Sequence, residues 1–277
     1  MQSDDRSNSH LPHATDRLDD WITAWREAGR FVLLLDFDGT LAPIVRHADM
    51  AALPERTRVV LDRLGQTPGL EMAVVSGRGM ADVREKVGIG SVAYAGNHGM
   101  EIEGPDISRR HEEAEAARPE LERVIERAGK VLENIEGAWI EDKGVTLSVH
   151  YRETPEGDVP RVREAVESAV AGANRLKLTR GKKVLEVRPD VDWHKGRAVE
   201  FLLDRLDPPS GTPVLYIGDD TTDEDAFRAL EGWRSGGGEG VVVGDPPDSE
   251  TAARSFVRSP EEVADLLERL ADRAGPT

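Results

Sequence analysis

An apolar run that ends in two closely spaced aspartates constrains the fold of this chain more than any other feature. Residues 31–41 read FVLLLDFDGTL. Five apolar residues followed by a turn signal predict a buried strand of a parallel sheet. Ligands of open α/β sheets bind where such strands end, which is the position of Asp36 and Asp38. Because side chains alternate across a strand, these two carboxylates share one side while Phe37 turns into the core.

The same two aspartates predict a cation site and phosphoryl transfer. Neighbouring carboxylates at the edge of an apolar core repel each other unless a proton or a cation lies between them, and Mg2+ is the usual cation for hard oxygen ligands. One carboxylate can attack phosphorus and form an acyl-phosphate while the other moves protons. The alternative is a turn at the end of a strand with solvated aspartates.

Strand-like and helix-like segments alternate at both ends of the chain. Buried strands are expected at 31–35, 70–75, 91–95, 214–217 and 241–243. Helices are expected between them, and this alternation predicts an α/β fold with a Rossmann-like, doubly wound parallel sheet.

The middle of the chain follows a different pattern. Residues 109–135 are rich in Glu, Arg and Ala and predict a long exposed helix that Pro119 interrupts. A hairpin follows, and then a second helix and a second hairpin. This predicts a smaller α+β cap domain inserted into the core. The expected division is a disordered N-terminus at 1–14, a core formed by 15–104 and 189–277, and a cap at 105–188.

The composition excludes several classes of partner. The chain has 277 residues with 36 basic and 53 acidic side chains, a net charge of −17. Such a surface argues against binding to nucleic acid or to anionic membranes. There is no Cys, no apolar stretch long enough to span a membrane and no signal peptide. We therefore expect a monomeric cytoplasmic protein, and the excess of acid fits either salt adaptation or a GC-rich genome.

Three further signals lie where this architecture puts a site. Ser76 ends the second strand and could hold a phosphate oxygen, or could simply begin a helix. Lys195 opens a helix, where a cation is unfavourable for the dipole unless an anion lies nearby, so a phosphate contact and a solvated lysine are both open.

The third signal is GDDTTDED at 218–225. Its carboxylates would repel one another without a cation, although a solvated acidic helix start is the alternative. Asp219 is the best direct metal ligand. Asp220 and Asp223 are expected to orient waters or Lys195.

In order along the chain, DFDGT, SGR, a lysine and GDDTTDED resemble the motif series of the haloacid dehalogenase superfamily of phosphohydrolases. A narrower resemblance, to the trehalose-6-phosphate phosphatase family, covers residues 30–270. It is carried by AGNHGMEI (95–102), EDKGVTLSVHYR (141–152), GKKVLEVRP (181–189) and WHKGRAVEFLL (193–203). The family implies a Rossmann-like core with an α+β cap between its second and third motifs. Asn97 stands where many members carry Ser.

The resemblance implies a role for each matching residue. Asp36 resembles the nucleophile and a Mg2+ ligand. Asp38 resembles the general acid/base, with its backbone carbonyl on the metal. Asp219 resembles the third metal ligand, and Ser76 and Lys195 resemble the phosphate clamps. The implied substrate-binding residues are Arg78, Asn97, His98, Gly99, Glu141, Lys143, Lys182 and Glu186, of which the last four resemble cap residues that hold the distal glucose.

The expected function is Mg2+-dependent hydrolysis of trehalose 6-phosphate to trehalose and phosphate through an aspartyl-phosphate. The alternatives are a phosphatase or phosphotransferase of the same core that acts on another sugar phosphate, such as a sucrose- or glucosylglycerol-type phosphate, and a noncatalytic sugar-phosphate sensor. Both Asp36 and Asp38 are present, and this favours an enzyme.

Overall fold

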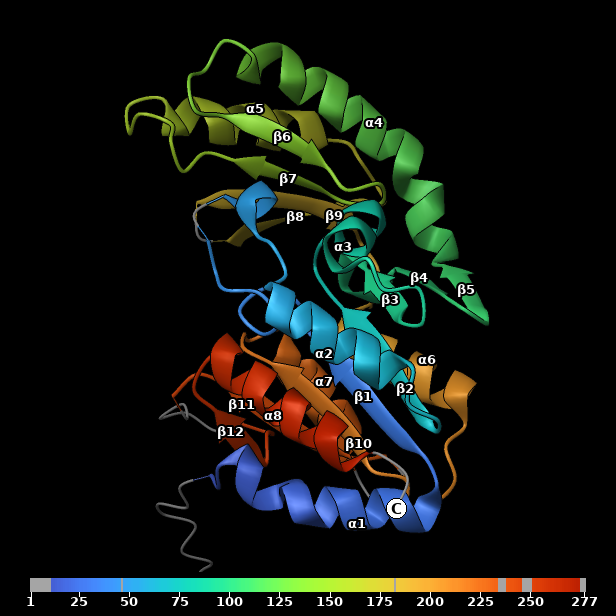
Figure 1. Cartoon of the computed structure of the whole chain (residues 1–277). Coiled ribbons are helices and arrows are strands. Elements are labelled where there is room, and N and C mark those ends of the chain that lie inside the picture. The colour runs from blue at the N-terminus through green and yellow to red at the C-terminus, as the bar shows by residue number, and fades with distance from the viewer. Residues whose placement is uncertain (1–10, 46, 182, 234–237, 246–250, 275–277) are drawn as a thin grey trace, which may run out of the picture.

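The computed structural model describes residues 11–45, 47–181, 183–233, 238–245 and 251–274. Two β-sheets form two layered bodies, with the eight-stranded sheet in the lower part of Figure 1 and the four-stranded sheet in the upper part. The larger body is the α/β core that the alternation of strands and helices predicts. The smaller one is built from the inserted middle of the chain.

The eight-stranded sheet has the order β12-β11-β10-β1-β2-β3-β4-β5. The neighbours from β12 to β3 pair in parallel, while β3, β4 and β5 pair antiparallel. The strands are β1 (Phe31–Leu35), β2 (Leu70–Val75), β3 (Ala93–Gly96), β4 (Glu101–Gly104), β5 (Ile107–Arg110), β10 (Val214–Gly218), β11 (Glu239–Val243) and β12 (Ser255–Val257). Strand β1 lies between β2 and β10, so its carboxyl end points to the middle of one sheet edge.

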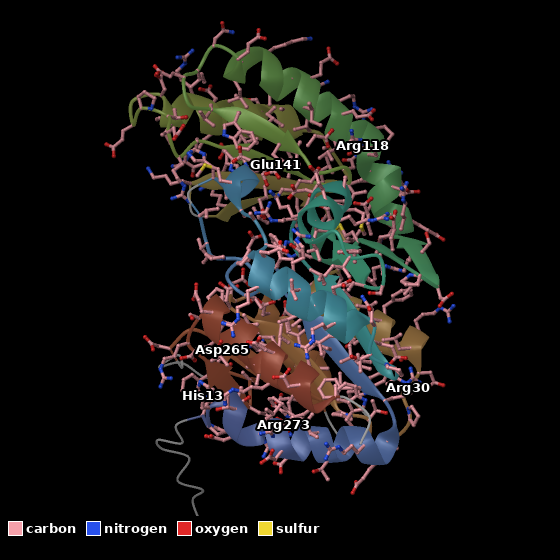
Figure 2. All side chains as sticks on the ribbon, viewed as in Figure 1. His13, Arg30, Arg118, Glu141, Asp265 and Arg273 are labelled. Atoms are coloured by element: carbon pink, nitrogen blue, oxygen red, sulfur yellow. The ribbon has the colours of Figure 1, made fainter. Side chains whose placement is uncertain are left out.

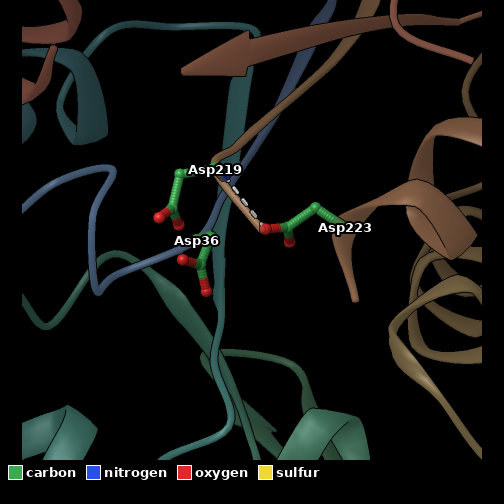
Figure 3. Close-up of side chains that lie close together, drawn as sticks. All are labelled: Asp36, Asp219 and Asp223. Carbon is green, nitrogen blue, oxygen red and sulfur yellow. Dashed lines mark hydrogen bonds between the residues drawn. The ribbon is translucent and has the colours of Figure 1, made fainter. Parts of the chain in front are cut away.

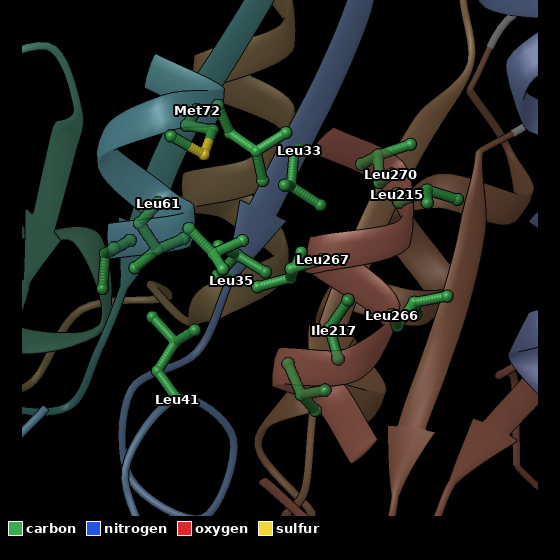
Figure 4. Close-up of a cluster of buried hydrophobic side chains, with 14 of the residues drawn as sticks. Leu33, Leu35, Leu41, Leu61, Met72, Leu215, Ile217, Leu266, Leu267 and Leu270 are labelled. Atoms are coloured by element: carbon green, nitrogen blue, oxygen red, sulfur yellow. The ribbon is translucent and has the colours of Figure 1, made fainter. Parts of the chain in front are cut away.

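Helices cover both faces of this sheet, which is why every residue of β1 is buried. Alternate side chains of β1 enter opposite cores: Leu33 and Leu35 pack on one face, and Val32 and Leu34 on the other. Figure 4 shows the first core between the sheet and two helices, with Leu61 and Leu267 facing β1. Burial of each such side chain contributes about 1.5–3 kcal/mol, so the position of the β1 terminus is strongly determined.

The helices of the core divide between the two faces. One face carries α1 (Leu18–Ala28), α2 (Glu55–Gly65), α3 (Met80–Val87) and α8 (Pro260–Arg273), and the other carries α6 (Lys195–Leu206) and α7 (Asp223–Glu231). Short 3-10 helices occur at η1 (Ala14–Arg17), η2 (Ala48–Met50) and η3 (Asn97–Gly99).

The cap contains two helices on one face of an antiparallel sheet of order β6-β7-β9-β8. The elements are α4 (Glu112–Leu132), β6 (Trp139–Asp142), β7 (Leu147–His150), α5 (Val159–Val170), β8 (Leu176–Gly181) and β9 (Val184–Pro189). The two hairpins and the two helices follow the predicted order. Residues Leu121, Val149 and Leu185 belong to the core between the helices and this sheet.

Helix α4 corrects one prediction. It continues through Pro119 for 21 residues, and it is not simply exposed. Ala117, Leu121 and Val124 on one face are buried against the cap sheet. This packing offsets the backbone hydrogen bond that a proline inside a helix cannot donate.

The beginning of the chain and the start of the insertion also differ in detail from the sequence-based expectation. Of the N-terminal residues 1–14, expected to be disordered, 1–10 lie outside the described residues. His13, however, forms a β-bridge with Phe256, and its ring nitrogen lies 2.9 Å from Glu262 Oε2. Strand β5, within the expected cap range 105–188, is still part of the core sheet.

Among the described residues, none of the helices combines the length and the apolar character that crossing a bilayer requires. The cytoplasmic location and the monomeric state stay predictions.

Candidate active site

Asp36 lies at the carboxyl end of the central strand. Its backbone amide donates to the carbonyl of Ile217 on β10, and the residue is only 4 % exposed. Burial raises the pKa of the Asp36 carboxyl well above its usual range, and the ammonium group of Lys195 opposes this rise. The sheet therefore holds a carboxylate at a buried position that needs a compensating charge.

Lys195, the first residue of α6, supplies part of that charge. Its Nζ lies 2.8 Å from Asp36 Oδ1 and 2.7 Å from Asp223 Oδ1. Burial alone would lower the pKa of Lys195, but the carboxylates of Asp36 and Asp223 outweigh it and raise the pKa. The group therefore stays protonated in a nearly water-free position.

Asp223 organises the loop between β10 and α7. Its Oδ2 accepts hydrogen bonds from the backbone amides of Asp219 and Asp220, both at 3.0 Å, one of which is drawn in Figure 3. Its Oδ1 accepts from Lys195 and, at 2.6 Å, from the hydroxyl of Tyr216. Because both oxygens are fully engaged, Asp223 holds the loop and the lysine in place.

Asp219 brings a second carboxylate to Asp36. One oxygen from each of Asp36, Asp219 and Asp223 falls within 4.8 Å of the others, as the three side chains in Figure 3 illustrate. Burial, together with the charges of Asp223 and Asp220, raises the pKa of Asp219 to about 7. A Cβ at Gly39 would collide with the Asp219 carboxylate, so only glycine permits this approach. Two crowded carboxylates with hard oxygen donors fit a divalent cation such as Mg2+.

Asp38 faces the same edge but has a different partner. Arg78 binds it with two hydrogen bonds, from Nε to Oδ2 at 2.7 Å and from Nη2 to Oδ1 at 2.6 Å. The third branch of this buried guanidinium reaches Asp82 Oδ2 at 2.6 Å. Phe37 is fully buried, as strand alternation predicts. Arg78, expected to bind substrate, thus fixes the direction of the Asp38 carboxylate.

Ser76 follows β2 and is completely buried. Its Oγ accepts a hydrogen bond from the backbone amide of Arg78 at 3.2 Å. The next two residues, Gly77 and Arg78, line the cavity described below, whereas Ser76 lies behind them.

A cavity of about 310 Å³ lies over these carboxylates, between core and cap. Its core wall includes Asp36, Asp38, Ile44, Val45, Gly77, Arg78, His98, Lys195, Asp220 and Thr222. Its cap wall includes Glu141, Lys143, Ser148, His150, Arg152, Lys183, Val184 and Glu186. Two larger cavities, of about 490 and 470 Å³, lie beside α3, and neither contains Asp36 or Lys195.

Strand register explains the cap wall. Glu141, Ser148 and Glu186 are direct neighbours across β6, β7 and β9, so they share one face of the sheet. In the next row, His150 stacks on Trp139 with ring centroids 4.1 Å apart. Figure 2 labels Glu141 on this part of the cap.

Glu141 is held as an anion in the cavity wall. Burial alone would raise the pKa of Glu141, but His150 Nε2, 2.8 Å from its Oε2, and the charge of Lys143 lower it below its usual value. Across the cavity, burial and the charge of Lys195 lower the pKa of His98 to about 3, so that its imidazole is neutral. The substrate would therefore meet a mixture of donors and acceptors.

The substrate-binding residues expected from the sequence are only partly brought together. Arg78, His98, Glu141, Lys143 and Glu186 line the cavity. Lys182 lies outside the described residues. Asn97 and Gly99 are buried beside the cavity.

Sequence reasoning missed Ser148 and His150, although the alternation of LSVHYR places both on one face of the predicted strand. It also missed Arg152, which continues the same alternation, and Lys183 and Thr222, whose positions next to turns leave no such periodic signal.

Comparison with known proteins agrees with this geometry. The family model of trehalose-phosphatase matches residues 34–261. The trehalose 6-phosphate phosphatase RA3 of Zea mays is 40 % identical over 92 % of this chain and 73 % of its own length. The trehalose-phosphate phosphatase of Mycobacterium avium (strain 104) is 38 % identical over 99 % and 70 %, respectively.

Solved structures of similar fold also include a trehalose-6-phosphate phosphatase. The C-terminal domain of the C. albicans trehalose-6-phosphate phosphatase has a TM-score of 0.74 and 26 % identity, and the match covers 96 % of this chain and 99 % of that one. A haloacid dehalogenase-like hydrolase from Bacteroides thetaiotaomicron shares the fold, with a TM-score of 0.56. With a buried aspartate and lysine at the end of the central strand and a polar cap above them, the chain belongs to the trehalose-phosphatase family of haloacid dehalogenase-type phosphatases.

Proposed function

We propose that this chain hydrolyses trehalose 6-phosphate, with Asp36 as the nucleophile and Mg2+ as the cofactor. The observation that carries the proposal is the buried Asp36–Lys195 pair at the floor of a cavity whose opposite wall is a polar cap. The names of the relatives suggest the substrate. The division into a core and an inserted cap between Arg110 and Trp193 is part of the same proposal.

Asp36, Asp219 and the backbone carbonyl of Asp38 would hold the metal. When bound, Mg2+ supplies positive charge that offsets the repulsion of these carboxylates and of the phosphate oxygens. Lys195 uses two of its three N–H bonds on Asp36 and Asp223, so its third can reach a phosphoryl oxygen. Ser76 would assist by fixing the backbone amides that follow it.

The chemistry then needs two attacks, by Asp36 and later by water, and two proton transfers. Asp36 attacks phosphorus and becomes an aspartyl-phosphate, while Asp38, protonated, gives its proton to the departing sugar oxygen. Asp38 next takes a proton from the water that hydrolyses the intermediate. Arg78 orients the Asp38 carboxylate for this second step through its two hydrogen bonds.

The cap wall suits a neutral sugar ring. Two carboxylates, Glu141 and Glu186, face three cations, Lys143, Arg152 and Lys183, so the charges nearly cancel while the wall offers both donors and acceptors for hydroxyl groups. Lys182 would belong to this group.

The proposal is tested by measuring phosphate release from a panel of sugar phosphates. Trehalose 6-phosphate should give the highest kcat/KM, ahead of sucrose 6-phosphate, glucosylglycerol phosphate and glucose 6-phosphate. Excess chelator should abolish release, and Asp36→Asn should lower the rate by at least ~10³-fold while leaving a folded protein. If another sugar phosphate reacted faster, that compound would be the better candidate for the substrate. Binding without turnover would favour a sensor.

A further inference from the structure

The Asn97 side chain makes three hydrogen bonds, two of which reach across the boundary between core and cap. It follows β3, is fully buried, and has a backbone φ of 52°. Its Nδ2 donates to Glu101 Oε2 at 2.7 Å in the core and to the carbonyl of Lys143 at 2.8 Å in the cap. Its Oδ1 accepts from Thr146 Oγ1, also in the cap, at 2.5 Å. Every polar atom of the side chain is therefore used.

The partners in the cap belong to the tight turn between β6 and β7. Within this turn, the amide of Lys143 donates to the carbonyl of Thr146 at 3.0 Å, and the amide of Gly144 donates to Asp142 Oδ1 at 3.0 Å. The turn also presses on the start of α3, where a Cβ at Gly79 would lie 3.1 Å from the Lys143 carbonyl oxygen. One core amide thus holds a rigid turn of the cap against the core.

The held residue also lines the cavity. The backbone carbonyl of Lys143 points to Asn97, while its ammonium group is 3.9 Å from Glu141 Oε2 in the cavity wall. A shift of the turn would therefore move Lys143 relative to Asp36, which is fixed by the sheet. Asn97 does not line the cavity itself, so it acts on the substrate through Lys143.

We propose that Asn97 is a positioning residue that locks the β6–β7 turn onto the core and thereby sets the distance between the sugar-binding cap wall and the reacting phosphate. This inference rests on the proposed function. The lock needs an amide, because it must donate to two oxygens and accept from a hydroxyl. A carboxylate at this position would face the oxygens of Glu101 and of the Lys143 carbonyl without a proton to offer.

The test uses substitutions on both sides of the boundary. Asn97→Asp keeps the shape and removes both donors, whereas Thr146→Val removes the cap hydroxyl. Asn134→Asp is the matched control, because it adds the same charge at an exposed cap position, where the side chain donates to the Lys130 carbonyl at 3.3 Å. For each full-length variant, kcat and KM are measured with trehalose 6-phosphate and with p-nitrophenyl phosphate, which is too short to reach the cap.

We expect Asn97→Asp to raise KM for trehalose 6-phosphate by about tenfold or more, with kcat/KM for p-nitrophenyl phosphate changed by less than about threefold. Thr146→Val should act in the same direction and more weakly, because it removes only the hydrogen bond from Thr146 Oγ1 to Asn97 Oδ1. Asn97→Asp keeps that acceptor and removes the donors to Glu101 and Lys143, so the double variant should lose more than either single variant. Equal losses of kcat/KM on both substrates, or an unchanged KM for trehalose 6-phosphate, would contradict the proposed positioning role of Asn97.

A readout without substrate keeps the two proposals separate. Amide hydrogen exchange of residues 143–146 should become faster in Asn97→Asp and in Thr146→Val, and stay as in the wild type in Asn134→Asp. If the wild type released no phosphate from trehalose 6-phosphate, the proposed function would fail while the exchange data still decided on the lock. Unchanged exchange in both variants would refute the lock even if activity fell.

Discussion

At the scale of single residues, the hydroxyl of Tyr216 is the least expected part of the site. It is fully buried on β10 and donates to Asp223 Oδ1, the oxygen that also accepts from Lys195. Tyr216→Phe removes one of two donors from that oxygen and leaves room for the Lys195 ammonium to shift away from Asp36. We expect kcat for the sugar phosphate to fall by about tenfold with little change in KM, as steady-state kinetics would show.

Tyr94→Phe is the matched control for this prediction. The Tyr94 hydroxyl is also buried and is bonded to the backbone of Ile89, but it lies by another cavity. Both variants should lose stability, since Tyr216→Phe removes one hydrogen bond from Asp223 and Tyr94→Phe removes two from the backbone of Ile89. Only Tyr216→Phe should lose turnover, and a similar kcat in the two variants would show that the Tyr216 hydroxyl serves the fold alone.

The low pKa of buried His98 leads us to expect a particular pH dependence of the free energy of unfolding. Its pKa is about 3 in the folded protein, against about 6.5 in an unfolded chain, so between these values only the unfolded chain binds the proton. The free energy of unfolding therefore falls as the pH drops below about 6.5, by up to about 1.4 kcal/mol per pH unit. His98→Asn removes this contribution, and Asn tolerates the φ of 57° found here.

Urea unfolding near pH 7 and near pH 5 measures this effect. The wild type should lose about 2 kcal/mol more than His98→Asn over that range. Buried carboxyl groups such as Asp36, whose pKa is raised, act in the opposite direction but are present in both proteins. Parallel curves for the two proteins would contradict the prediction.

At the scale of elements, the face of the cap sheet that carries Glu186 is expected to select the sugar. Glu186 lies opposite Ser148 on β7 and lines the cavity. Glu186→Ala should lower kcat/KM for trehalose 6-phosphate by about ten- to a hundredfold, because hydrogen bonds to a charged group contribute about 1.5–3 kcal/mol. Activity on p-nitrophenyl phosphate should hardly change, and Glu164→Ala, on the exposed side of α5, should affect neither substrate.

Equal losses on both substrates in Glu186→Ala would place this residue in the support of the fold or of the chemistry. Lys182 was expected to share this role, and the same pair of assays on Lys182→Ala would test that prediction.

Elements with a strong local pattern could be predicted from the sequence. The five apolar residues of β1 and the alternating residues of β7 identify these segments as strands without reference to distant parts of the chain. Strands β4 and β5 were missed, because EIEGPDISRR mixes charges with few apolar residues and lies at one end of the sheet, where β5 is the last strand. Their strand structure depends on β3, which lies next to β4.

The candidate site shows the same limit. Asp36, Lys195 and Asp219 could be found from the sequence, because each lies in a recognisable motif. Asp36 and Asp219 follow strands that end at the same edge of the sheet, and Lys195 begins a helix. The contacts of Arg78 with Asp38 and of Asn97 with Thr146 could not, because each depends on the direction of a side chain between segments far apart in the sequence. Distance along the chain, more than residue type, limits such predictions.

At the scale of the whole molecule, the net charge of −17 should make stability depend on salt. Ions screen the repulsion among excess carboxylates. They also weaken surface ion pairs such as Arg118–Asp142, but each exposed pair contributes only about 0–1 kcal/mol. We therefore expect Tm to rise between about 0.05 and about 1 M NaCl in the presence of chelator. A flat or falling Tm would remove salt adaptation as the account of the composition.

The place of β1 between β2 and β10 has a consequence for biosynthesis. A ribosome releases β1 and β2 early, then the entire cap, and only afterwards β10. At ordinary translation speeds, one edge of β1 therefore remains unpaired for on the order of ten seconds before β10 is synthesised. The cap, whose strands and helices are contiguous in the sequence, can fold during that interval. The nascent chain can thus complete its cap first, and the strand that carries Asp36 has neighbours on both sides only after β10 has emerged.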